Sequence, residues 1–315
     1  MENDKMRKVI EAAKLYYQLD YSQNQIADTL GVSRPTVSRL LQQAKAEGIV
    51  TIDIKDPTED VEVLRSLLKV KFQLKHVVIA FTPTYEESVV KKYIGQAAAN
   101  YVHELAKDGD MISASWGSTM YQVALHLKEK SLNNSFVVQL NGGVSDADVH
   151  ISPSEIVHLF GKAFNVTPYF MYLPAIVDHI LVKQAMLTDR HIRRVMDMGK
   201  NANIAVFTAG APTPDSVLIN SNYFHDDELE IIKTNAVGDI CSRYYDSNGE
   251  ICLPSIDERT VGIELADLRT KEHSVLVAGG PSKINAIFGA LKGKYGNTLV
   301  TDQITAKALL KKLDT

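Results

Sequence analysis

Side chains able to hydrogen-bond nucleic acid are concentrated in a short stretch near the N-terminus. Between Ser33 and Gln42 the chain carries hydroxyl, guanidinium and amide groups and no acidic residue. Such groups bond base edges and phosphate oxygens. The apolar residues of the stretch recur at helical spacing, so the polar side chains share the outer face of one helix. The residues expected to contact DNA, on this helix and the one before it, are Gln23, Ser33, Arg34, Pro35, Thr36, Ser38, Arg39 and Gln42.

Three closely spaced helices would position this face. The first is expected over residues 4–19, and the second begins at Ser22, which forms a capping box with Gln25. Gly31 suits the left-handed residue that ends a helix, and Ser33 is a candidate N-cap for the third helix. Two helices joined by so short a turn are typical of the helix-turn-helix, whose second helix enters the major groove.

The alternating run Ile49–Ile54 predicts a short strand that would form a wing beside the third helix. We therefore assign residues 1–56 to a winged helix-turn-helix domain. Two alternatives stay open at this level. One is a three-helix bundle with no DNA role, a common arrangement of short helices. The other is a protein–protein module that uses the same polar face.

A second group of candidate residues follows apolar strands in the rest of the chain, where glycines stand beside hydroxyl, amide or ammonium groups. These segments are residues 115–119, 141–143, 208–210 and 279–283. Glycines let a backbone approach a ligand closely, and the free N–H groups at a helix start bind anions. Together with Lys283, the four segments predict a pocket for a small phosphorylated molecule. Any one of them alone is also consistent with a tight turn that only connects a strand to a helix. Trp116, the single tryptophan, would lie at the pocket rim or in the core.

The elements that carry these segments alternate between apolar strands and helices. This pattern predicts a parallel sheet covered on both faces, an α/β fold in which ligands bind beyond the carboxyl ends of the strands. The strands are expected at residues 77–81, 111–116, 136–140, 169–173, 204–209, 274–278 and 298–301. The helices are expected at residues 86–107, 119–130, 154–164, 177–198 and 283–291.

One further helix, over residues 58–74, separates the two regions. Its apolar residues suit either pairing with its twin across a dimer or packing on the sheet of the large domain, and the pattern favours neither. The predicted organisation is a DNA-binding domain at residues 1–56, a linker or dimerisation helix at 57–75, and an α/β effector-binding domain at 76–315.

Charge and composition limit the kinds of partner. The first 55 residues carry eight Lys or Arg and seven Asp or Glu, so of the net charge of −4 they hold +1 and the rest holds −5. DNA contacts must therefore come from a few well-placed cations. No apolar run is long enough for a membrane helix, and the N-terminus lacks the apolar region of a signal peptide, so a cytoplasmic protein is expected. Cys241 and Cys252 lack metal-ligand spacing, and we expect no disulfide, metal or cofactor.

An enzyme acting on a sugar phosphate would have a similar pocket and is the main alternative, as an isomerase or deaminase with an accessory N-terminal domain. It would need a positioned acid–base pair. Four carboxylates are available for one, and we expect them instead at the surface or against ligand hydroxyls: Asp239, Asp257, Glu258 and Glu264. No Ser-His-Asp or Cys-His arrangement and no nucleotide-binding fingerprint occurs. The sequence therefore predicts no catalytic residue.

Nearly the whole chain resembles the SorC/DeoR-type regulators of sugar metabolism in Gram-positive bacteria. The segments that carry the resemblance are residues 21–27, 33–41, 115–117, 238–243, 259–262 and 277–280. It implies a sugar-isomerase-like, Rossmann-type effector domain, a homodimer or homotetramer on operator DNA, and a phosphorylated sugar that alters DNA affinity. A repressor released by its effector is the favoured form, although the sequence does not determine whether the effector weakens or strengthens DNA binding.

The resemblance also implies positions for the effector. The phosphate would lie near Gly117, Ser118, Thr119 and Lys283, and sugar hydroxyls would meet Asn141, Gly142, Asp239, Asp257 and Glu264. With the remaining strand-end glycines, the expected effector site comprises Gly117, Ser118, Thr119, Asn141, Gly142, Gly143, Asp239, Asp257, Glu264, Gly279, Gly280 and Lys283.

One position departs from the pattern. Regulators of this kind that respond to deoxyribose 5-phosphate are similar in having a Gly-Gly pair, but a lysine precedes it, placed to form a Schiff base with the open-chain aldehyde. This chain has Asn141 there, and an amide cannot form an imine. The effector is therefore expected to bind without a covalent bond, or to be a different sugar phosphate.

Overall fold

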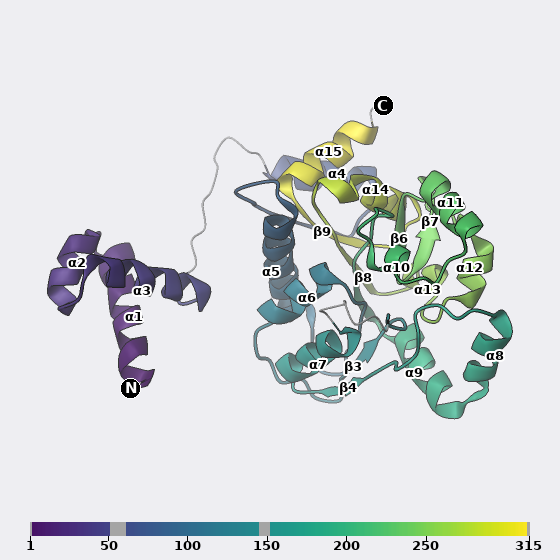
Figure 1. The fold of residues 1–315 in the computed structure, drawn as a ribbon, viewed down its shortest axis with the longest axis horizontal. Coiled ribbons are helices and arrows are strands. Elements are labelled where there is room, and N and C mark those ends of the chain that lie inside the picture. The colour runs from purple at the N-terminus through teal and green to yellow at the C-terminus, as the bar shows by residue number, and fades with distance from the viewer. Residues whose placement is uncertain (1, 51–60, 145–151, 314–315) are drawn as a thin grey trace. The chain divides into compact units, whose positions relative to one another are not determined.

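The computed structural model describes residues 2–50, 61–144 and 152–313 (Figure 1). Contacts between residues divide the chain into two units, Met1–Glu59 and Asp60–Thr315. Among the described residues, no helix has the length and apolar character needed to span a membrane.

The first unit contains α1 (Glu2–Tyr17), α2 (Gln23–Leu30) and α3 (Arg34–Ala46). The predicted caps are confirmed. Ser22 and Gln25 form the capping box of α2, Gly31 ends that helix with a left-handed φ of 61°, and Ser33 caps α3. These contacts satisfy backbone N–H groups that a helix start otherwise leaves without partners. The short connection between α2 and α3 therefore follows from local chemistry.

The core of this unit is the predicted one. Val37, Leu40 and Leu41 of α3 are buried against Ile26 of α2 and Val9 of α1. The polar face of α3 is thereby turned outward, as the helical periodicity requires. Ile49 and Val50 form a bend instead of the start of a strand, and residues 51–54 of the expected wing lie outside the described residues. The wing therefore stays a prediction.

The second unit is built on a parallel sheet that confirms the predicted α/β fold. Among the described residues its seven strands lie in the order β1-β9-β8-β5-β2-β3-β4. They are β1 (His76–Ala80), β2 (Met111–Ala114), β3 (Phe136–Gln139), β4 (Thr167–Tyr169), β5 (Ile204–Phe207), β8 (His273–Val277) and β9 (Thr298–Asp302). The central strands, such as β5, are short, apolar and buried, because both faces of the sheet are covered there, whereas the edge strand β4 is partly exposed.

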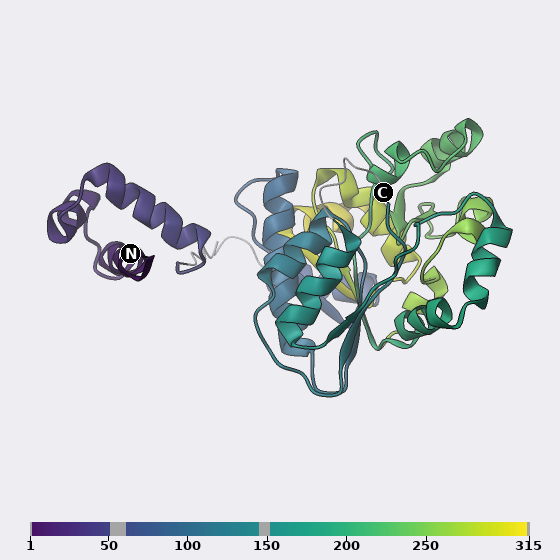
Figure 2. The same cartoon turned by 60° about the horizontal axis from the view of Figure 1, so that its bottom comes forward.

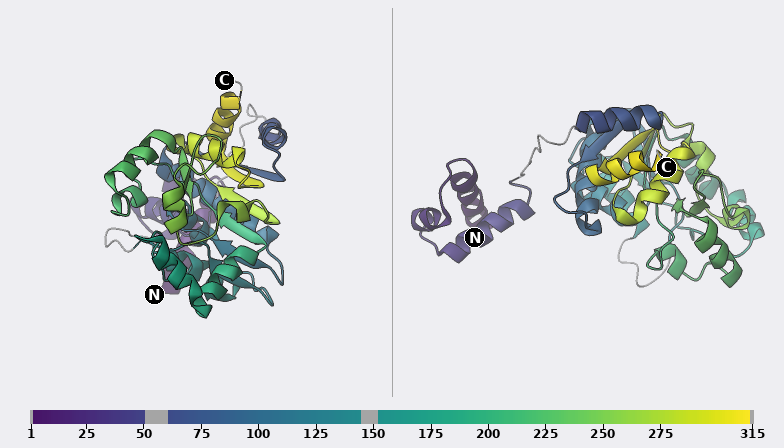
Figure 3. Two further views of the ribbon diagram at one scale, coloured as in Figure 1. Left: turned by 90° about the vertical axis from the view of Figure 1, so that its right-hand side faces the viewer. Right: turned by 90° about the horizontal axis from the view of Figure 1, so that it is seen from above.

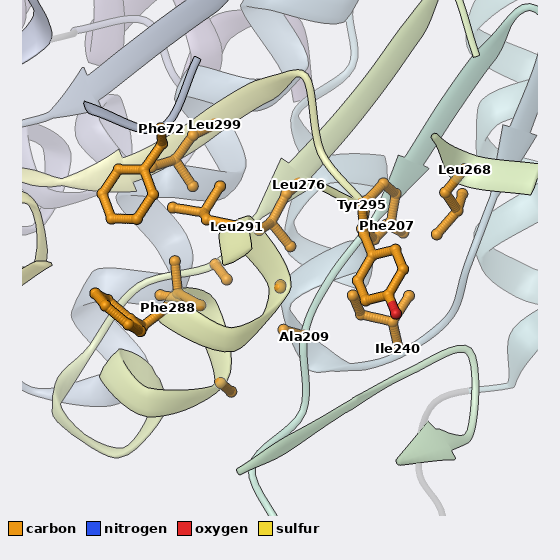
Figure 4. Close-up of a cluster of buried hydrophobic side chains, with 14 of the residues drawn as sticks. Phe72, Phe207, Ala209, Ile240, Leu268, Leu276, Phe288, Leu291, Tyr295 and Leu299 are labelled. Atoms are coloured by element: carbon orange, nitrogen blue, oxygen red, sulfur yellow. The ribbon is translucent and has the colours of Figure 1, made fainter. Parts of the chain in front are cut away.

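Side chains alternate between the two faces of the sheet. In β5, Ile204 and Val206 join one core cluster, whereas Ala205 and Phe207 join the other. The helices α5 (Glu87–Leu105), α6 (Ser118–His126) and α7 (Pro153–Phe164) lie side by side over the first face (Figure 2). Figure 4 shows the cluster on the second face, where Phe207 and Leu276 of the sheet lie near Tyr295 and Leu291.

The helix expected over residues 58–74 is α4 (Val61–Lys71), and it packs within the large domain. Its Leu68 is fully buried, and the helix contacts β1 and α15 (Gln303–Leu313). Figure 3 shows α4 and α15 next to each other. Leu67 and Val70 lie on its outer side, 42% and 76% exposed.

Three sequence predictions need correction. The single helix expected over residues 177–198 is two helices, α8 (Ile180–Thr188) and α9 (Arg190–Asn201). They separate at Asp189, whose side chain accepts hydrogen bonds from the N–H groups of His191 and Ile192 and so starts a new helix. The fourth strand ends at Tyr169 instead of beginning there, and α6 ends at His126, short of residue 130.

Several further elements, most of them short, were not predicted from the sequence. They are α10 (Val217–Asn220), α11 (Asp226–Asn235), α12 (Pro254–Arg259), α13 (Leu265–Leu268), the 3-10 turn η1 (Pro281–Lys283) before α14 (Ile284–Lys292), and the antiparallel pair β6 (Gly238–Ile240) and β7 (Arg243–Tyr245).

Candidate DNA-binding surface and ligand cavity

The outer face of α3 presents the polar residues selected from the sequence. Arg34, Arg39 and Gln42 are exposed, together with the start of the helix at Ser33 and Pro35. Thr36 and Ser38, and Gln23 of α2, are partly exposed. Within the described residues neither guanidinium forms a hydrogen bond or an ion pair, so both are available to a partner. This geometry suits a helix that enters a DNA groove.

The large unit has a cavity at the carboxyl edge of its sheet, next to β2 and β5. From β2 the chain continues to β3 and β4 on one side, and from β5 it continues to β8 and β9 on the other. Connections that diverge in this way leave a crevice at the topological switch point, where α/β folds bind ligands. The cavity volume is about 190 Å³. Sites for drug-sized ligands have ~300–1,000 Å³, so this one suits a smaller molecule.

One part of the cavity supplies hydrogen-bond donors and a positive charge. The helix α6 starts there at Ser118 and Thr119, after Gly117, whose φ of 129° only glycine adopts readily. The Lys283 ammonium lies 3.3 Å from Thr119 Oγ1 and 3.4 Å from Thr208 Oγ1. A helix N-terminus beside a cation is a strong site for a phosphate group.

Burial sets the charge state of that cation. It lowers the pKa of Lys283 to about 8, helped by the charge of Lys91 and opposed by the carboxylate of Asp239. Lys283 is therefore mainly protonated at neutral pH but only weakly solvated. A phosphate would replace the missing solvation, because charge-assisted hydrogen bonds are strong in such surroundings.

Another part of the cavity supplies oxygen acceptors. Burial raises the pKa of the Asp239 carboxyl to about 6, while Lys283 and the N–H of Ser242 oppose the rise. A Cβ atom on Gly210 would lie 2.1 Å from Asp239 Oδ1, so only glycine allows this close approach. Asn141 is also buried here, and its Nδ2 donates to Ser242 Oγ at 3.3 Å. These oxygens suit the hydroxyl groups of a sugar.

The hairpin β6–β7 positions Asp239 and Ser242. Its two turn residues, Cys241 and Ser242, both have left-handed backbones with φ of 52° and 68°. A two-residue turn of this form is usually built from asparagine and glycine, which explains why the sequence did not reveal the hairpin. Burial raises the pKa of Cys241, so its thiol stays protonated and acts in packing.

The four strand-end segments do meet, but not every residue expected in the site lies in this cavity. Gly117, Ser118, Thr119, Asn141, Asp239 and Lys283 line it. Gly142, Gly143, Gly279 and Gly280 do not line it, and most of their backbone N–H groups have partners within the fold. Gly142 N donates to Val261 and its oxygen accepts from Trp116 Nε1, Gly143 N donates to Leu173, and Gly280 N donates to Asp302 and Thr305. A side chain on Gly279 would meet Asp302.

The two remaining carboxylates lie in a different place. Asp257 is ion-paired with the buried Arg243 at 2.5 Å, and Glu264 is exposed at the start of α13. Both line a separate cavity of about 260 Å³ that includes Lys183 of α8. The structure therefore does not bring these two carboxylates into the cavity lined by the other expected residues. Arg243 holds Asp257 away from the switch point by also bonding the backbone of the following loop.

The structure adds cavity residues that no motif indicated. Glu87 and Lys91 come from α5, where they form an ion pair of 3.4 Å, and Asp215 and Ser216 come from the loop before α10. Trp116 is partly exposed and lines the cavity, and it also packs against two apolar clusters, so it combines its two expected positions. Surface polar residues on helices and loops have no distinctive spacing, so only the fold brings them here.

Comparison with known proteins identifies both parts of the chain. Residues 56–311 match the sugar-binding domain family Sugar-bind, and residues 7–66 match the Crp-like helix-turn-helix domain. A deoxyribonucleoside regulator of Bacillus subtilis is 47% identical over 313 residues, covering 99% of this chain and 100% of the relative. The sorbitol operon regulator of Klebsiella pneumoniae is 32% identical over 317 residues, covering 99% and 100%. The chain belongs to the SorC/DeoR-type transcription regulators.

The structural comparison agrees with the sequence. The full-length sorbitol operon regulator SorC of Klebsiella pneumoniae aligns with a TM-score of 0.76 and 31% identity, covering 97% of this regulator and 98% of that chain. Since these relatives are transcription regulators, the alternative of a sugar-phosphate isomerase or deaminase is set aside. The helix-turn-helix match likewise sets aside a bundle without a DNA role.

Proposed function

We propose that this regulator represses a sugar or deoxyribonucleoside catabolic operon in the cytoplasm, and that a phosphorylated sugar in the cavity changes its affinity for operator DNA. The observation that carries the proposal is the lining of one cavity. The Lys283 ammonium and the start of α6 suit a phosphate, and the oxygens of Asp239 and Asn141 suit sugar hydroxyls. Deoxyribose 5-phosphate is the first candidate, because the relative with 47% identity is named for deoxyribonucleosides.

In the N-terminal unit, the outer face of α3 would contact the operator bases. Arg34 and Arg39 carry long, positively charged side chains on the exposed side of α3. The hydroxyls of Ser33 and Thr36 lie at the start of that helix. Arginine forms bidentate hydrogen bonds with guanine or phosphate, and the N–H groups at a helix N-terminus donate to phosphate. Two such helices in a symmetric oligomer would contact half-sites about one helical turn apart, or a multiple of it.

Self-association, as a homodimer or homotetramer, is supported by apolar side chains that the large domain leaves uncovered. Leu67 and Val70 of α4 and Leu181 of α8 are 42%, 76% and 63% exposed. Regulation then follows from linkage. If effector and DNA favour different arrangements of the subunits, each weakens the other by the same factor, commonly 5- to 150-fold.

The test is a gel-shift titration of the regulator against the upstream region of its own operon, repeated with a panel of sugar phosphates. We expect a specific shift that at least one sugar phosphate reverses. Arg39→Ala should weaken specific binding by about 10- to 100-fold, since one bidentate base contact contributes roughly 1–3 kcal/mol. It should leave effector binding unchanged.

Lys45→Ala is the matched control, because Lys45 is also exposed and basic but lies in the last turn of α3. It removes the same charge away from the expected reading positions. Equal losses from both variants would mean that non-specific attraction, and not the α3 face, determines the measured affinity. No response to any sugar phosphate would contradict the effector half of the proposal.

A further inference from the structure

The Asn141 side chain leaves one polar atom without a partner. The residue is 2% exposed and lines the ligand cavity. Its Nδ2 donates to Ser242, but its Oδ1 is buried and accepts no hydrogen bond from any described residue. A buried acceptor without a donor is costly and uncommon in folded proteins. Because Asn141 also lines the cavity, we infer that a ligand bound there supplies the missing donor.

Contacts on the other sides of Asn141 hold this oxygen in place. The backbone oxygen of Asn141 accepts from Gln139 Nε2 at 2.7 Å, and its backbone pairs with Gly262. A Cβ atom on Gly262 would lie 2.6 Å from Asn141 Cβ, so the two strands meet without spare room. Ser242, which fixes the amide nitrogen, is itself set in the tight turn of the β6–β7 hairpin. The acceptor is therefore preorganised before ligand arrives.

The chemistry of that acceptor decides which ligand group fits. A hydroxyl can donate its proton to Oδ1, whereas a carbonyl oxygen has only lone pairs and would face the amide oxygen with no proton between them. Asp239, the other acceptor in this part of the cavity, also requires a hydrogen-bond donor on the ligand. Both residues thus favour a polyhydroxylated ligand over one with a carbonyl group at this point.

We propose that Asn141 makes the cavity selective for a sugar phosphate that presents a hydroxyl group to Oδ1, and against an analogue with a carbonyl or a bare carbon at that position. This inference rests on the proposed function, because it takes the ligand to be a sugar phosphate. It assigns Asn141 the role of a specificity-determining residue, with Ser242 as the positioning residue that orients its amide.

The experiment uses the full-length regulator and isothermal titration. The probes are ribose 5-phosphate and the three analogues that each lack one hydroxyl: 1,4-anhydroribitol 5-phosphate, 2-deoxyribose 5-phosphate and 3-deoxyribose 5-phosphate. In the wild type one of the four phosphates should bind about 10- to 100-fold more weakly than the tightest of them, since it leaves Oδ1 unpaired. In Asn141→Leu, which has a similar shape and no acceptor, that difference should disappear.

Two further variants separate selectivity from folding. Asn141→Asp keeps an acceptor oxygen and should retain the discrimination that Asn141→Leu loses. Ser242→Ala releases the amide and should reduce the discrimination while leaving the phosphate contacts intact, so it tests the inference if Asn141→Leu does not fold. Asn100→Leu, the same change at an exposed position of α5, is the control and should behave as the wild type.

The outcomes distinguish this inference from the proposed function. If all four phosphates bind equally well, the selectivity of Asn141 is refuted and the effector site stands. Discrimination that persists in Asn141→Leu would also refute it, because another residue must then make the contact. If none of the four phosphates binds, a pentose-phosphate effector is contradicted and the inference falls with it.

Discussion

Replacing Lys283 by methionine should stabilise the unliganded regulator while weakening its effector binding. Methionine keeps an unbranched, apolar side chain and removes the buried charge. In the folded protein, burial lowers the pKa of Lys283 from 10.5 to about 8. At about 1.4 kcal/mol per pKa unit, this corresponds to at most about 3.5 kcal/mol lost from the free energy of unfolding at neutral pH. We expect a gain of roughly 1–3 kcal/mol in the variant, because the cavity keeps part of the hydration of the ammonium group.

The free energy of unfolding of the wild type should increase as the pH rises. The unfolded chain keeps the Lys283 proton up to a pKa of 10.5, whereas the folded protein releases it near pH 8. Between these values the unfolded state holds more protons, so the free energy of unfolding of the wild type should rise with pH across this window. Below pH 8 the full cost of the charge is present. Denaturant unfolding of both proteins at pH 7 and pH 10 should therefore give a difference that is large at pH 7 and small at pH 10.

The effector affinity of Lys283→Met should fall, although its stability rises. A hydrogen bond to a charged group contributes ~1.5–3 kcal/mol, so the Lys283→Met variant should bind a sugar phosphate about 10- to 150-fold more weakly by calorimetry. Lys92→Met removes one exposed charge from α5 and serves as the control that changes neither quantity. A Lys283→Met protein that is less stable at pH 7 and binds sugar phosphates as well as the wild type would refute the reasoning, since Lys283 would then be a structural residue.

Three further predictions concern the same cavity. Effector affinity in the wild type should fall above pH 8, by up to tenfold per pH unit, because Lys283 loses its proton there; calorimetry from pH 7 to 9.5 checks this, and a flat profile would contradict it. Gly210→Ala should displace Asp239, whose Oδ1 would lie 2.1 Å from the new Cβ atom, and lower the free energy of unfolding by about 1–3 kcal/mol in denaturant titrations. Trp116 fluorescence should respond to sugar phosphates, since this tryptophan lines the cavity; a constant signal during calorimetrically proven binding would show that the ligand lies elsewhere.

The sequence by itself determined the local features of both domains. The caps at Ser22, Gly31 and Ser33 depend on residues within three or four positions of one another, and so does the inward stripe of Val37, Leu40 and Leu41. The alternation of apolar strands with helices likewise predicted the parallel sheet, and with it the edge at which a ligand would bind. The fold class and the exposed face of α3 could therefore be derived without tertiary information.

Only the tertiary structure decided which strand-end residues share one cavity. Strand order places β5 between β2 and β8, and these two pairings bring Thr119, Thr208 and Lys283 together across more than 160 residues of chain. Asp239 enters through a hairpin whose turn has neither asparagine nor glycine, while Arg243 holds Asp257 in a separate cavity. These outcomes depend on contacts between distant segments, which local spacing does not encode, because the free energy of each comes from packing against a partner elsewhere in the fold.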